Sequence, residues 1–329
     1  MNTKSIKIAL ILPYFGCFPN YFHLWLKSAS YNKYFTFMIF TDNWNENYRV
    51  PENVRIIKSS LDEIKRRVSQ IIEYEFVLHN PYKLCDYKPL YGLIFEEYLK
   101  EYDFWGHCDP DIIWGDLWKF IGTEIFDNYD RIYERGHLSL YRNVNRINHA
   151  PLMRLENSCW SAKDVYTHKY IAHFDEGSLI SDLIKEVGGR QYKSIDCADI
   201  AFDKKQFVCV CDGVLTDDIA CFVFNDGVLK GITSHCEEKE FSYVHLQKRE
   251  MEIQVDVQED KFLIVPNAFL ELNEMILKEK IDLWQKKDVK YELKFALRKK
   301  KAQIKHILDG ALVFRLKKLK MKLLNHFRV

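Results

Sequence analysis

The sequence predicts an α/β protein built on a mixed, largely parallel sheet flanked by helices. Short apolar segments alternate along the chain with longer segments whose apolar residues recur at helical spacing. Polar residues follow directly at the ends of several apolar segments, which is where ligands bind in parallel sheets. The composition, 47% hydrophobic and 15% aromatic over 329 residues, is sufficient for a sizeable core in one large or two modest domains.

The first third of the chain alternates strands with helices, as parallel sheets require. Strands are predicted over 6–12, 35–40 and 54–57, and helices over 20–30 and 60–73. Pro13 to Gly16 breaks the first strand. Ser60 is a suitable N-cap for the second helix, and Glu63 three residues later predicts a capping box.

The middle of the chain predicts further helices and strands. A helix over 88–99 opens with Lys88-Pro89, which places proline in its first turn. Asn225-Asp226-Gly227, between two apolar segments, predicts a hairpin turn. The remaining helices are predicted over 115–121 and 179–187, with 150–170 helical or irregular, and the remaining strands over 102–108, 131–133, 137–141, 207–211, 220–224 and 241–246.

The stretch from Phe104 to Leu117 contains two carboxylates one residue apart. In an extended segment side chains alternate between faces, so Asp109 and Asp111 point the same way. Pro110 cannot donate to a sheet ladder, which predicts that the strand ends there. Such a pair can hold a hard divalent cation and leave coordination positions open for phosphate oxygens. The alternative is a loop that only caps a helix starting near Asp116.

The cysteine pattern and the apolar segments indicate the cellular compartment of the protein. The nine cysteines are odd in number and form no Cys-x-x-Cys pair, which favours reduced thiols in a cytosolic protein over a disulfide framework or a zinc knuckle. No run of eighteen apolar residues is present, so no membrane-spanning helix is expected. The apolar segment 6–12 is short and is not followed by a small-residue cleavage site, so it is interpreted as a strand and not as a signal peptide.

The C-terminal residues differ in charge from the rest of the chain. From Lys290 to Val329 there are 13 Lys and Arg and 2 Asp and Glu, a net charge of +11, against −10 for residues 1–289. This pattern predicts two basic amphipathic helices broken near Asp309-Gly310, which favours attachment to an anionic membrane surface. The alternative is a terminal helix packed on the body with its lysines solvated. The apolar residues at helical spacing are Leu293, Leu297, Ile304, Leu308, Leu312, Leu316, Leu319, Leu323 and Phe327.

Four stretches together resemble a GT-A type glycosyltransferase, and more narrowly the bacterial enzymes of capsule and O-antigen gene clusters. They are Ile8–Phe15, Asp86–Gly92, Asp103–Asp116 and Gly136–Asn143. These stretches cover about the first half of the chain and follow one another in the order typical of the GT-A fold. The third stretch is the most specific. The resemblance implies a GT-A-like catalytic domain over 1–285, with a nucleotide-sugar half over about 1–120 and an acceptor half over about 121–285, followed by the basic tail over 286–329.

The resemblance gives the two carboxylates a role. In the GT-A fold the Asp-x-Asp pair binds Mn²⁺ or Mg²⁺ and, through it, the diphosphate of a nucleotide sugar, whose developing charge the cation neutralises. Asp111 would be the more direct ligand, and Asp109 would lie nearer the ribose or outside the first ligand shell. Enzymes of this type often take a third ligand from a histidine late in the domain. His245 is the candidate, although a single histidine on a strand can also be purely structural.

Further donor-binding candidates lie at strand ends or beside expected helix termini: Pro13, Tyr14, Asp42, Asn43, Lys88 and Lys248. Asp42 and Asn43 follow the second strand, where they could bind the base or the ribose. Lys88 precedes an expected helix N-terminus, which favours an anion, and could hold the diphosphate or the donor sugar. Lys248 and the adjacent Arg249 could reach phosphate, and the alternative for these basic residues is a solvated surface.

On the acceptor side, a reaction that inverts the anomeric centre needs a base facing the incoming hydroxyl. Asp175 and Glu176 are the best pair by their order along the fold, and capping of the next helix is the competing explanation. His137, Arg142 and Asn143 would border the sugar or the acceptor.

These residues predict a metal-dependent glycosyltransferase that moves a sugar from a UDP-sugar to a lipid-linked or growing surface-polysaccharide acceptor. UDP, and a hexose such as galactose or galactofuranose, follow from fold-level analogy. The predicted location is cytoplasmic, peripheral on the inner face of the bacterial plasma membrane. The alternatives are a non-catalytic α/β scaffold with a basic membrane- or nucleic-acid-binding tail, and a sugar nucleotidyltransferase. The few aromatic residues in the tail argue against nucleic acid.

Overall fold

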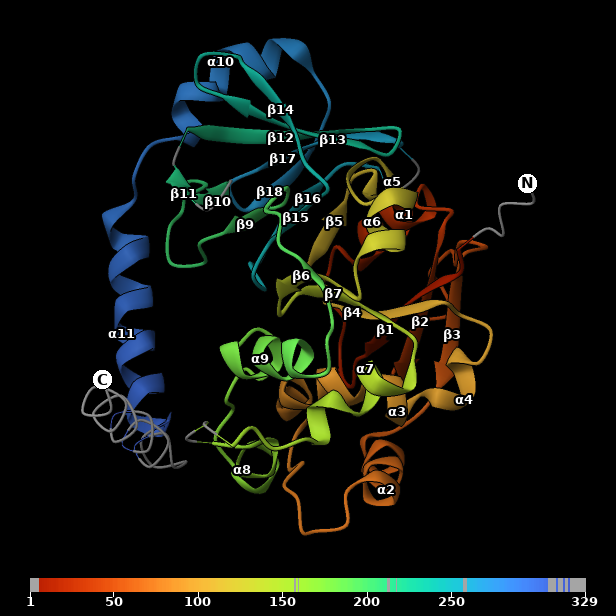
Figure 1. The fold of residues 1–329 in the computed structure, drawn as a ribbon. Helices are drawn as coiled ribbons and strands as arrows, with labels where there is room; N and C mark the ends of the chain where they lie inside the picture. The colour runs from red at the N-terminus through yellow and green to blue at the C-terminus, as the bar shows by residue number, and fades with distance from the viewer. Residues whose placement is uncertain are drawn as a thin grey trace.

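A seven-stranded mixed sheet forms the centre of the computed structural model (Figure 1). The structure describes residues 6–156, 158, 160–211, 214–216, 218–256, 259–306, 312, 316 and 319. The strand order is β3-β2-β1-β4-β7-β6-β8, and the first four strands run parallel. The strands are β1 (Ile8–Pro13), β2 (Phe35–Thr41), β3 (Val54–Lys58), β4 (Phe104–Cys108), β6 (Arg131–Arg135), β7 (Leu138–Arg142) and β8 (Gln191–Tyr192). The mixed sheet confirms the predicted α/β class.

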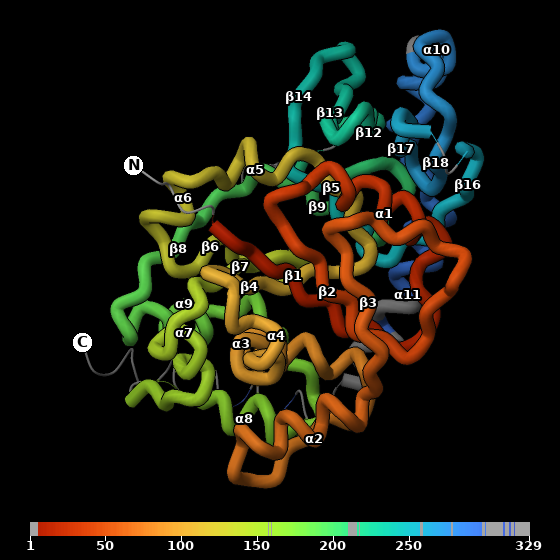
Figure 2. The backbone as a smooth tube through the Cα atoms, turned by 90° about the vertical axis from the view of Figure 1, so that its right-hand side faces the viewer, coloured from red at the N-terminus to blue at the C-terminus, as the bar shows by residue number. Residues whose placement is uncertain are grey.

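Alternate residues of the central strands face opposite helical layers. In β1, Ala9 and Ile11 pack into one core cluster, while Ile8 and Leu10 pack into another. The first cluster is closed by α2 (Leu61–Ile71), α3 (Tyr91–Ile94), α4 (Glu96–Leu99), α7 (Asn145–His149), α8 (Ala162–Thr167) and α9 (Ser178–Glu186). The second is closed by α1 (Phe22–Ser30), α5 (Leu117–Phe120) and α6 (Thr123–Asn128). Figure 2 shows α2, α3 and α8 on one side of β1 to β3 and α1 and α5 on the other.

Two smaller sheets extend the fold beyond α1. The five-stranded sheet, in the order β11-β10-β9-β15-β5, consists of β5 (Ile112–Trp114), β9 (Ala198–Ile200), β10 (Cys209–Cys211), β11 (Val214–Thr216) and β15 (Tyr243–His245). The six-stranded sheet, in the order β14-β13-β12-β17-β18-β16, consists of β12 (Ile219–Asn225), β13 (Val228–Thr233), β14 (Glu238–Glu240), β16 (Glu252–Gln254), β17 (Lys261–Val265) and β18 (Ala268–Glu271). Because β5 follows β4 directly, the chain passes between sheets through the Asp109–Asp111 stretch.

The predicted hairpin turn is confirmed between β12 and β13. Asp226 and Gly227 have φ angles of 50° and 86°, and Asn225 pairs with Val228 across the turn. Two consecutive residues with positive φ are what a two-residue hairpin loop of matching twist requires. The strands β16 to β18 have no counterpart among the sequence predictions.

The capping of one helix and the start of another differ from the sequence predictions. The side chain of Ser60 caps α2, but the carboxylate of Glu63 turns to Ser59 and Arg67, so no capping box forms. The start predicted for the helix over 88–99 is wrong. Residues Pro81–Leu90 form a 3₁₀ helix, η1, because Asn80 accepts a hydrogen bond from the Lys83 backbone and Pro81 occupies the first turn.

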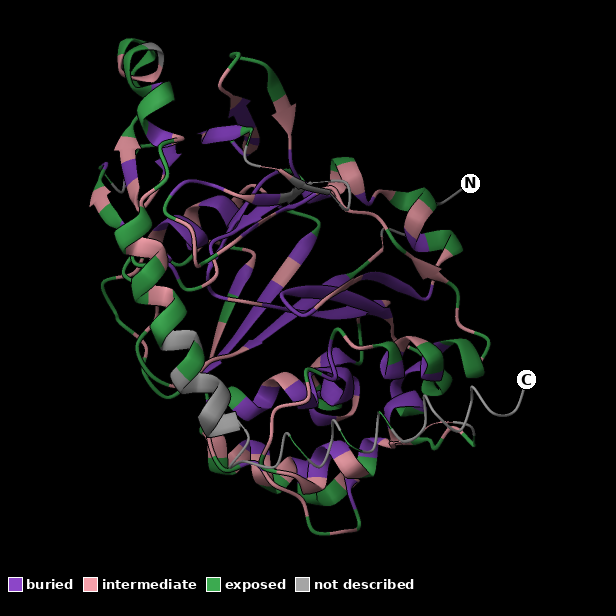
Figure 3. Ribbon diagram, turned by 90° about the vertical axis from the view of Figure 1, so that its left-hand side faces the viewer, coloured by how far each residue is buried: buried purple, intermediate pink, exposed green. Residues whose placement is uncertain are grey.

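The chain ends in two helices. α10 (Glu274–Trp284) packs Ile281 and Trp284 on the six-stranded sheet. α11 (Val289–His306) runs along one side of the molecule, and its side chains from Val289 to Leu297 are exposed or half-buried (Figures 1 and 3). The helix break predicted near Asp309-Gly310 lies outside the described residues. Among the described helices, none has the length and apolar character needed to cross a bilayer.

Candidate functional site

The carboxyl ends of β1 and β4 open into a pocket of about 560 Å³. In an open α/β sheet this edge is the usual place for a ligand. The pocket brings together candidates from segments far apart in the chain: Pro13, Tyr14, Lys88, Asp109, Asp111, His137, Asp175, Glu176, His245 and Lys248.

Five sequence candidates do not line this pocket: Arg249, described below, and Asp42, Asn43, Arg142 and Asn143. Asp42 accepts a hydrogen bond from the backbone of Gly16, and Asn43 contacts the thiol of Cys17, so both lie on the neighbouring loop. Arg142 pairs with Asp130 and donates to the backbone carbonyls of Phe126 and Tyr129, at the C-terminal end of α6. Asn143 donates to the carbonyls of Leu99 and Tyr102. These contacts give Arg142 and Asn143 structural roles in place of the predicted ones.

Asp109, Asp111 and His245 converge at the junction of the two sheets. β15 runs antiparallel to β5 with His245 opposite Ile112, which places the imidazole beside Asp111. One ligand atom from each of the three side chains lies within 4.8 Å of the others. Asp116, by contrast, caps α5 through the Lys119 backbone, so the capping role proposed for this stretch belongs to Asp116 and not to the pair.

The side chain of Asp111 has an unsatisfied oxygen. Asp111 is 1% exposed, and its Oδ2 accepts a hydrogen bond of 2.6 Å from the Lys248 backbone. Among the described residues Oδ1 has no hydrogen-bond partner, and it lies 3.4 Å from His245 Nε2. A buried orphaned carboxylate oxygen, a second carboxylate and an imidazole are donors suited to Mn²⁺, and the carboxylates also to Mg²⁺. The residues present therefore fit a divalent cation.

The electrostatics of this cluster favour positive charge at His245. Burial would lower the pKa of His245, but Asp111 and then Asp199 raise it to about 10. Burial likewise opposes the charge on Asp111, yet His245 and the Lys248 backbone hold its pKa well below the usual range. A cation bound at Nε2 would take the place of the proton that His245 otherwise carries between two carboxylates.

Asp199 is a site residue that the sequence analysis missed. β9 runs parallel to β15, with Asp199 beside His245 in the register. Its Oδ1 accepts hydrogen bonds of 2.8 Å from both His245 Nδ1 and Gln247 Nε2. The only sequence indication is an acidic residue inside the apolar segment Ala198-Asp199-Ile200, which is too short to predict a strand.

Lys88 connects the two acidic groups of the pocket. Its Nζ lies 2.7 Å from Asp109 Oδ1, 3.3 Å from Asp175 Oδ2 and 2.6 Å from the Gly136 carbonyl. Although burial disfavours the ammonium, Asp109 and Asp175 raise the pKa of Lys88 well above its ordinary value. Lys88 lies in the last turn of η1, so the expectation that it sits at a helix N-terminus is wrong.

Asp175 has the properties of a proton acceptor. It is 2% exposed, and burial raises its pKa to about 6 against the opposing effect of Lys88. Within the part of the chain that the structure describes, its Oδ1 has no hydrogen-bond partner. The neighbouring Glu176 faces the backbone N–H of Gly136 at 3.4 Å. Gly177 is the N-cap of α9 and no side chain caps that helix, so the capping explanation for Asp175 and Glu176 is wrong.

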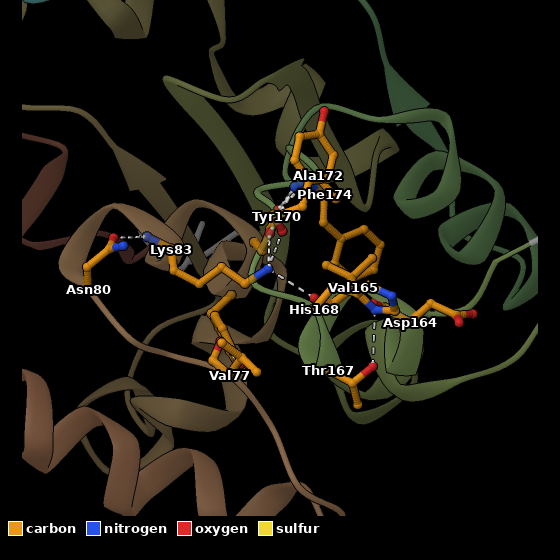
Figure 4. A network of polar contacts seen from close by, with 12 residues as sticks. Val77, Asn80, Lys83, Asp164, Val165, Thr167, His168, Tyr170, Ala172 and Phe174 are labelled. Carbon is orange, nitrogen blue, oxygen red and sulfur yellow. Dashed lines mark hydrogen bonds and ion pairs between the residues drawn. The ribbon is translucent and has the colours of Figure 1, made fainter. Parts of the chain in front are cut away.

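A buried ion pair fixes the segment that leads to Asp175. Lys83 and Asp86 are fully buried, with Nζ and Oδ2 2.7 Å apart. Figure 4 shows Lys83 extended from η1 toward this segment. The pair binds four of its backbone groups, which are the carbonyls of Val165 and Tyr170 and the N–H groups of Ala172 and Phe174. One buried pair thus joins the helix that carries Lys88 to the loop that carries Asp175.

Lys248 and Arg249 have different surroundings. The ammonium of Lys248 lies 4.2 Å from the ring centroid of Tyr82, at the rim of the pocket. Arg249 is buried and donates to the carbonyls of Ala201, Lys204 and Lys205. The solvated surface considered for Arg249 is therefore wrong, because its guanidinium holds the loop that follows β9.

The comparisons with known proteins can be set against this geometry. A family model matches residues 10–273. The chain belongs to that family, DUF6625, a family of unknown function. The DUF6625 match includes every candidate site residue from Pro13 to Lys248 and ends before α10. No curated protein matches the chain.

Two solved structures of the galactosyltransferase LgtC are similar in part. The complex of LgtC with donor and acceptor sugar analogues shows 14% identity and a TM-score of 0.35, covering 58% of this chain and 75% of LgtC. An active-site mutant of LgtC shows 13% identity and a TM-score of 0.34, covering 58% and 74%. Similarity of this extent establishes no function, which has to be inferred from the pocket.

Proposed function

We propose that this chain is a metal-dependent glycosyltransferase of the GT-A type. The observation that carries the proposal is the convergence of Asp109, Asp111 and His245, with an orphaned buried oxygen on Asp111, at the carboxyl ends of the parallel strands β1 and β4. Such an edge accepts nucleotides, and such a donor set accepts the cation that accompanies a diphosphate. The pocket volume is within the range of small-ligand sites.

Each residue then has a defined task. Asp111 and His245 would hold Mn²⁺ or Mg²⁺ together with Asp109, and the ion would supply a Lewis acid for the leaving diphosphate. Lys248 and Tyr14 line the pocket beside this cluster and would contact the donor. Asp175 would accept the proton of the incoming acceptor hydroxyl.

The donor and acceptor follow from the resemblance of the sequence motifs to enzymes of surface-polysaccharide synthesis. The donor would be a UDP-hexose, with galactose or galactofuranose as the first candidates. The acceptor would be a lipid-linked or growing polysaccharide. Residues 1–285 would form the catalytic unit and residues 286–329 its basic tail.

The tail would attach the enzyme to the inner face of the plasma membrane. Val289, Leu293 and Leu297 follow one another at four-residue spacing on α11 and are 66%, 60% and 64% exposed. A cavity at the junction of α10 and α11 is lined by four lysines, which are Lys205, Lys286, Lys287 and Lys290. An exposed apolar stripe flanked by lysines has the composition of an interfacial helix on anionic lipid.

Thermal unfolding with nucleotides tests the central assignment. UDP, UDP-galactose, UDP-glucose and GDP-mannose are each added with and without Mn²⁺ to the native chain, to Asp111→Ala and to the matched control Asp116→Ala, which lies outside the pocket. A ligand that binds only folded protein raises the midpoint. We expect a metal-dependent rise with a UDP ligand that Asp111→Ala abolishes and Asp116→Ala retains. A well-folded native sample that no nucleotide stabilises would contradict the proposal.

A further inference from the structure

The orientation of His245 is set by its neighbours on two sides. Nδ1 donates to Asp199 Oδ1 at 2.8 Å, while Nε2 faces Asp111 Oδ1 at 3.4 Å. The two nitrogens lie on different edges of the imidazole, so a hydrogen bond that fixes one of them also fixes the direction of the other. Asp199 therefore determines where the Nε2 lone pair of His245 points.

Asp199 is itself held in place. The parallel register of β9 and β15 sets its backbone beside His245, and Gln247 donates a second hydrogen bond of 2.8 Å to the same oxygen. The ring of His137 stacks on His245 with centroids 4.2 Å apart and planes at 29°. His137 is in turn in contact with the Tyr243 hydroxyl at 3.1 Å. Rotation of the His245 ring would break the Asp199 bond and this stack together.

We propose that Asp199 is a positioning residue for the cation site, which holds His245 with its proton on Nδ1 and its Nε2 directed at an ion shared with Asp109 and Asp111. This inference rests on the metal site of the proposed function and adds a residue to it. A carboxylate behind a ligating imidazole fixes the tautomer and strengthens the ligand, and its loss costs about 10- to 100-fold in metal affinity.

A rival set of metal ligands shares only His245 with the set proposed above. Ligand atoms of His137, Asp199 and His245 also lie within 4.8 Å of one another, and no described residue forms a hydrogen bond with the buried His137 Nε2. In that arrangement Asp199 and His137 would themselves be ligands. The present geometry favours the positioning role, because the Asp199 oxygen nearest His245 already accepts two hydrogen bonds.

The experiment is a titration of the nucleotide-free protein with Mn²⁺, in which the free ion is measured by electron paramagnetic resonance. The variants are Asp199→Ala, Asp199→Asn, His137→Phe and His245→Ala, with Asp196→Asn as the matched control. Asp196 precedes the same strand but accepts hydrogen bonds from Tyr133 and Ser242 instead. A thermal unfolding measurement in the presence of a chelator establishes that each variant is folded without metal.

We expect Asp199→Ala to weaken Mn²⁺ binding about 10- to 100-fold, with Asp199→Asn between it and the native chain. Asp196→Asn and His137→Phe, which retains a stacking ring, should remain within about twofold of the native affinity. In pulsed measurements the nitrogen coupling of Mn²⁺-bound imidazole should weaken in Asp199→Ala and persist in Asp196→Asn, a change that a purely structural role would not produce.

The outcomes that would contradict the inference can be distinguished from one another. Native affinity in a folded Asp199→Ala protein overturns the positioning role and leaves the metal site intact. A loss in His137→Phe equal to that in His245→Ala overturns it in favour of the rival ligand set. Absence of Mn²⁺ binding by the native chain overturns the metal site itself, and the inference with it.

Discussion

Lys88 Nζ lies 2.7 Å from Asp109 Oδ1, so the protein supplies its own counter-charge to one of the two carboxylates of the candidate cation site. The same ammonium is 3.3 Å from Asp175, the candidate base. One ammonium group therefore joins the candidate cation site to the candidate base.

Replacing Lys88 by methionine should destabilise the fold. Asp109 and Asp175 would face each other without a counter-charge, and breaking a buried pair in this way typically costs about 3 kcal/mol or more. Equilibrium unfolding in urea measures the loss. The control is Lys119→Met, which removes an exposed partner of Glu240 and should cost no more than about 1 kcal/mol. Equal losses in the two variants would contradict the central role given to Lys88.

The pKa of Asp175, about 6, predicts an acid limb in the activity. A base works only when it has lost its proton, so the rate of UDP release from the UDP-sugar donor should fall as the pH drops through about 6 and level off above it. Asp175→Asn should be slow at every pH and show no such limb. A native profile that stays flat from pH 5 to pH 8 would exclude Asp175 as the base.

Glu176 offers a second test of the same assignment. Its negative charge is one of the influences that raise the pKa of Asp175. Glu176→Gln removes that charge, so the midpoint of the acid limb should move to lower pH while the limb itself persists. A midpoint that moves upward, or that disappears, would assign the limb to a group other than Asp175.

The sequence predicted the carboxylate pair from local rules alone. Asp109 and Asp111 are separated by one proline, and β4 ends before that proline as expected. The sheet class followed from the alternation of strands and helices. His245 came from the resemblance to GT-A enzymes, since nothing in Tyr243-Val-His245 distinguishes it locally.

Asp199 and η1 could not be predicted in the same way. Asp199 acquires its place through the register of β9 against β15, a contact between segments 46 residues apart. η1 begins at the Asn80 cap, whereas Lys88-Pro89 also has the form of a helix start, and local sequence does not rank the two. Arg249 holds the loop after β9 through carbonyl contacts that exist only once the sheets are assembled.

The Lys83–Asp86 pair should behave as one unit in the stability of the loop before Asp175. Lys83→Met or Asp86→Leu alone leaves an uncompensated buried charge and should cost about 3–5 kcal/mol. The double variant should recover part of that loss, which a double-mutant cycle in urea quantifies. Strictly additive losses would show that the two charges do not depend on each other.

Leu293 and Leu297 should determine binding to anionic membranes. Removing a leucine side chain from water is worth about 1.5–3 kcal/mol, so Leu293→Glu and Leu297→Glu should each weaken co-sedimentation with phosphatidylglycerol vesicles by about tenfold or more. Native binding should fall at high salt and be absent with phosphatidylcholine vesicles, because the surrounding lysines contribute through anionic headgroups.

The matched control is Met275→Glu, which places the same charge on an exposed apolar residue of α10. It should leave vesicle binding within about twofold of the native chain, since α10 packs on the six-stranded sheet through its other face. Native binding by the two leucine variants, or an equal loss in Met275→Glu, would show that the exposed stripe of α11 is not the membrane contact. Binding to RNA and not to vesicles would instead support the nucleic-acid alternative for the basic tail.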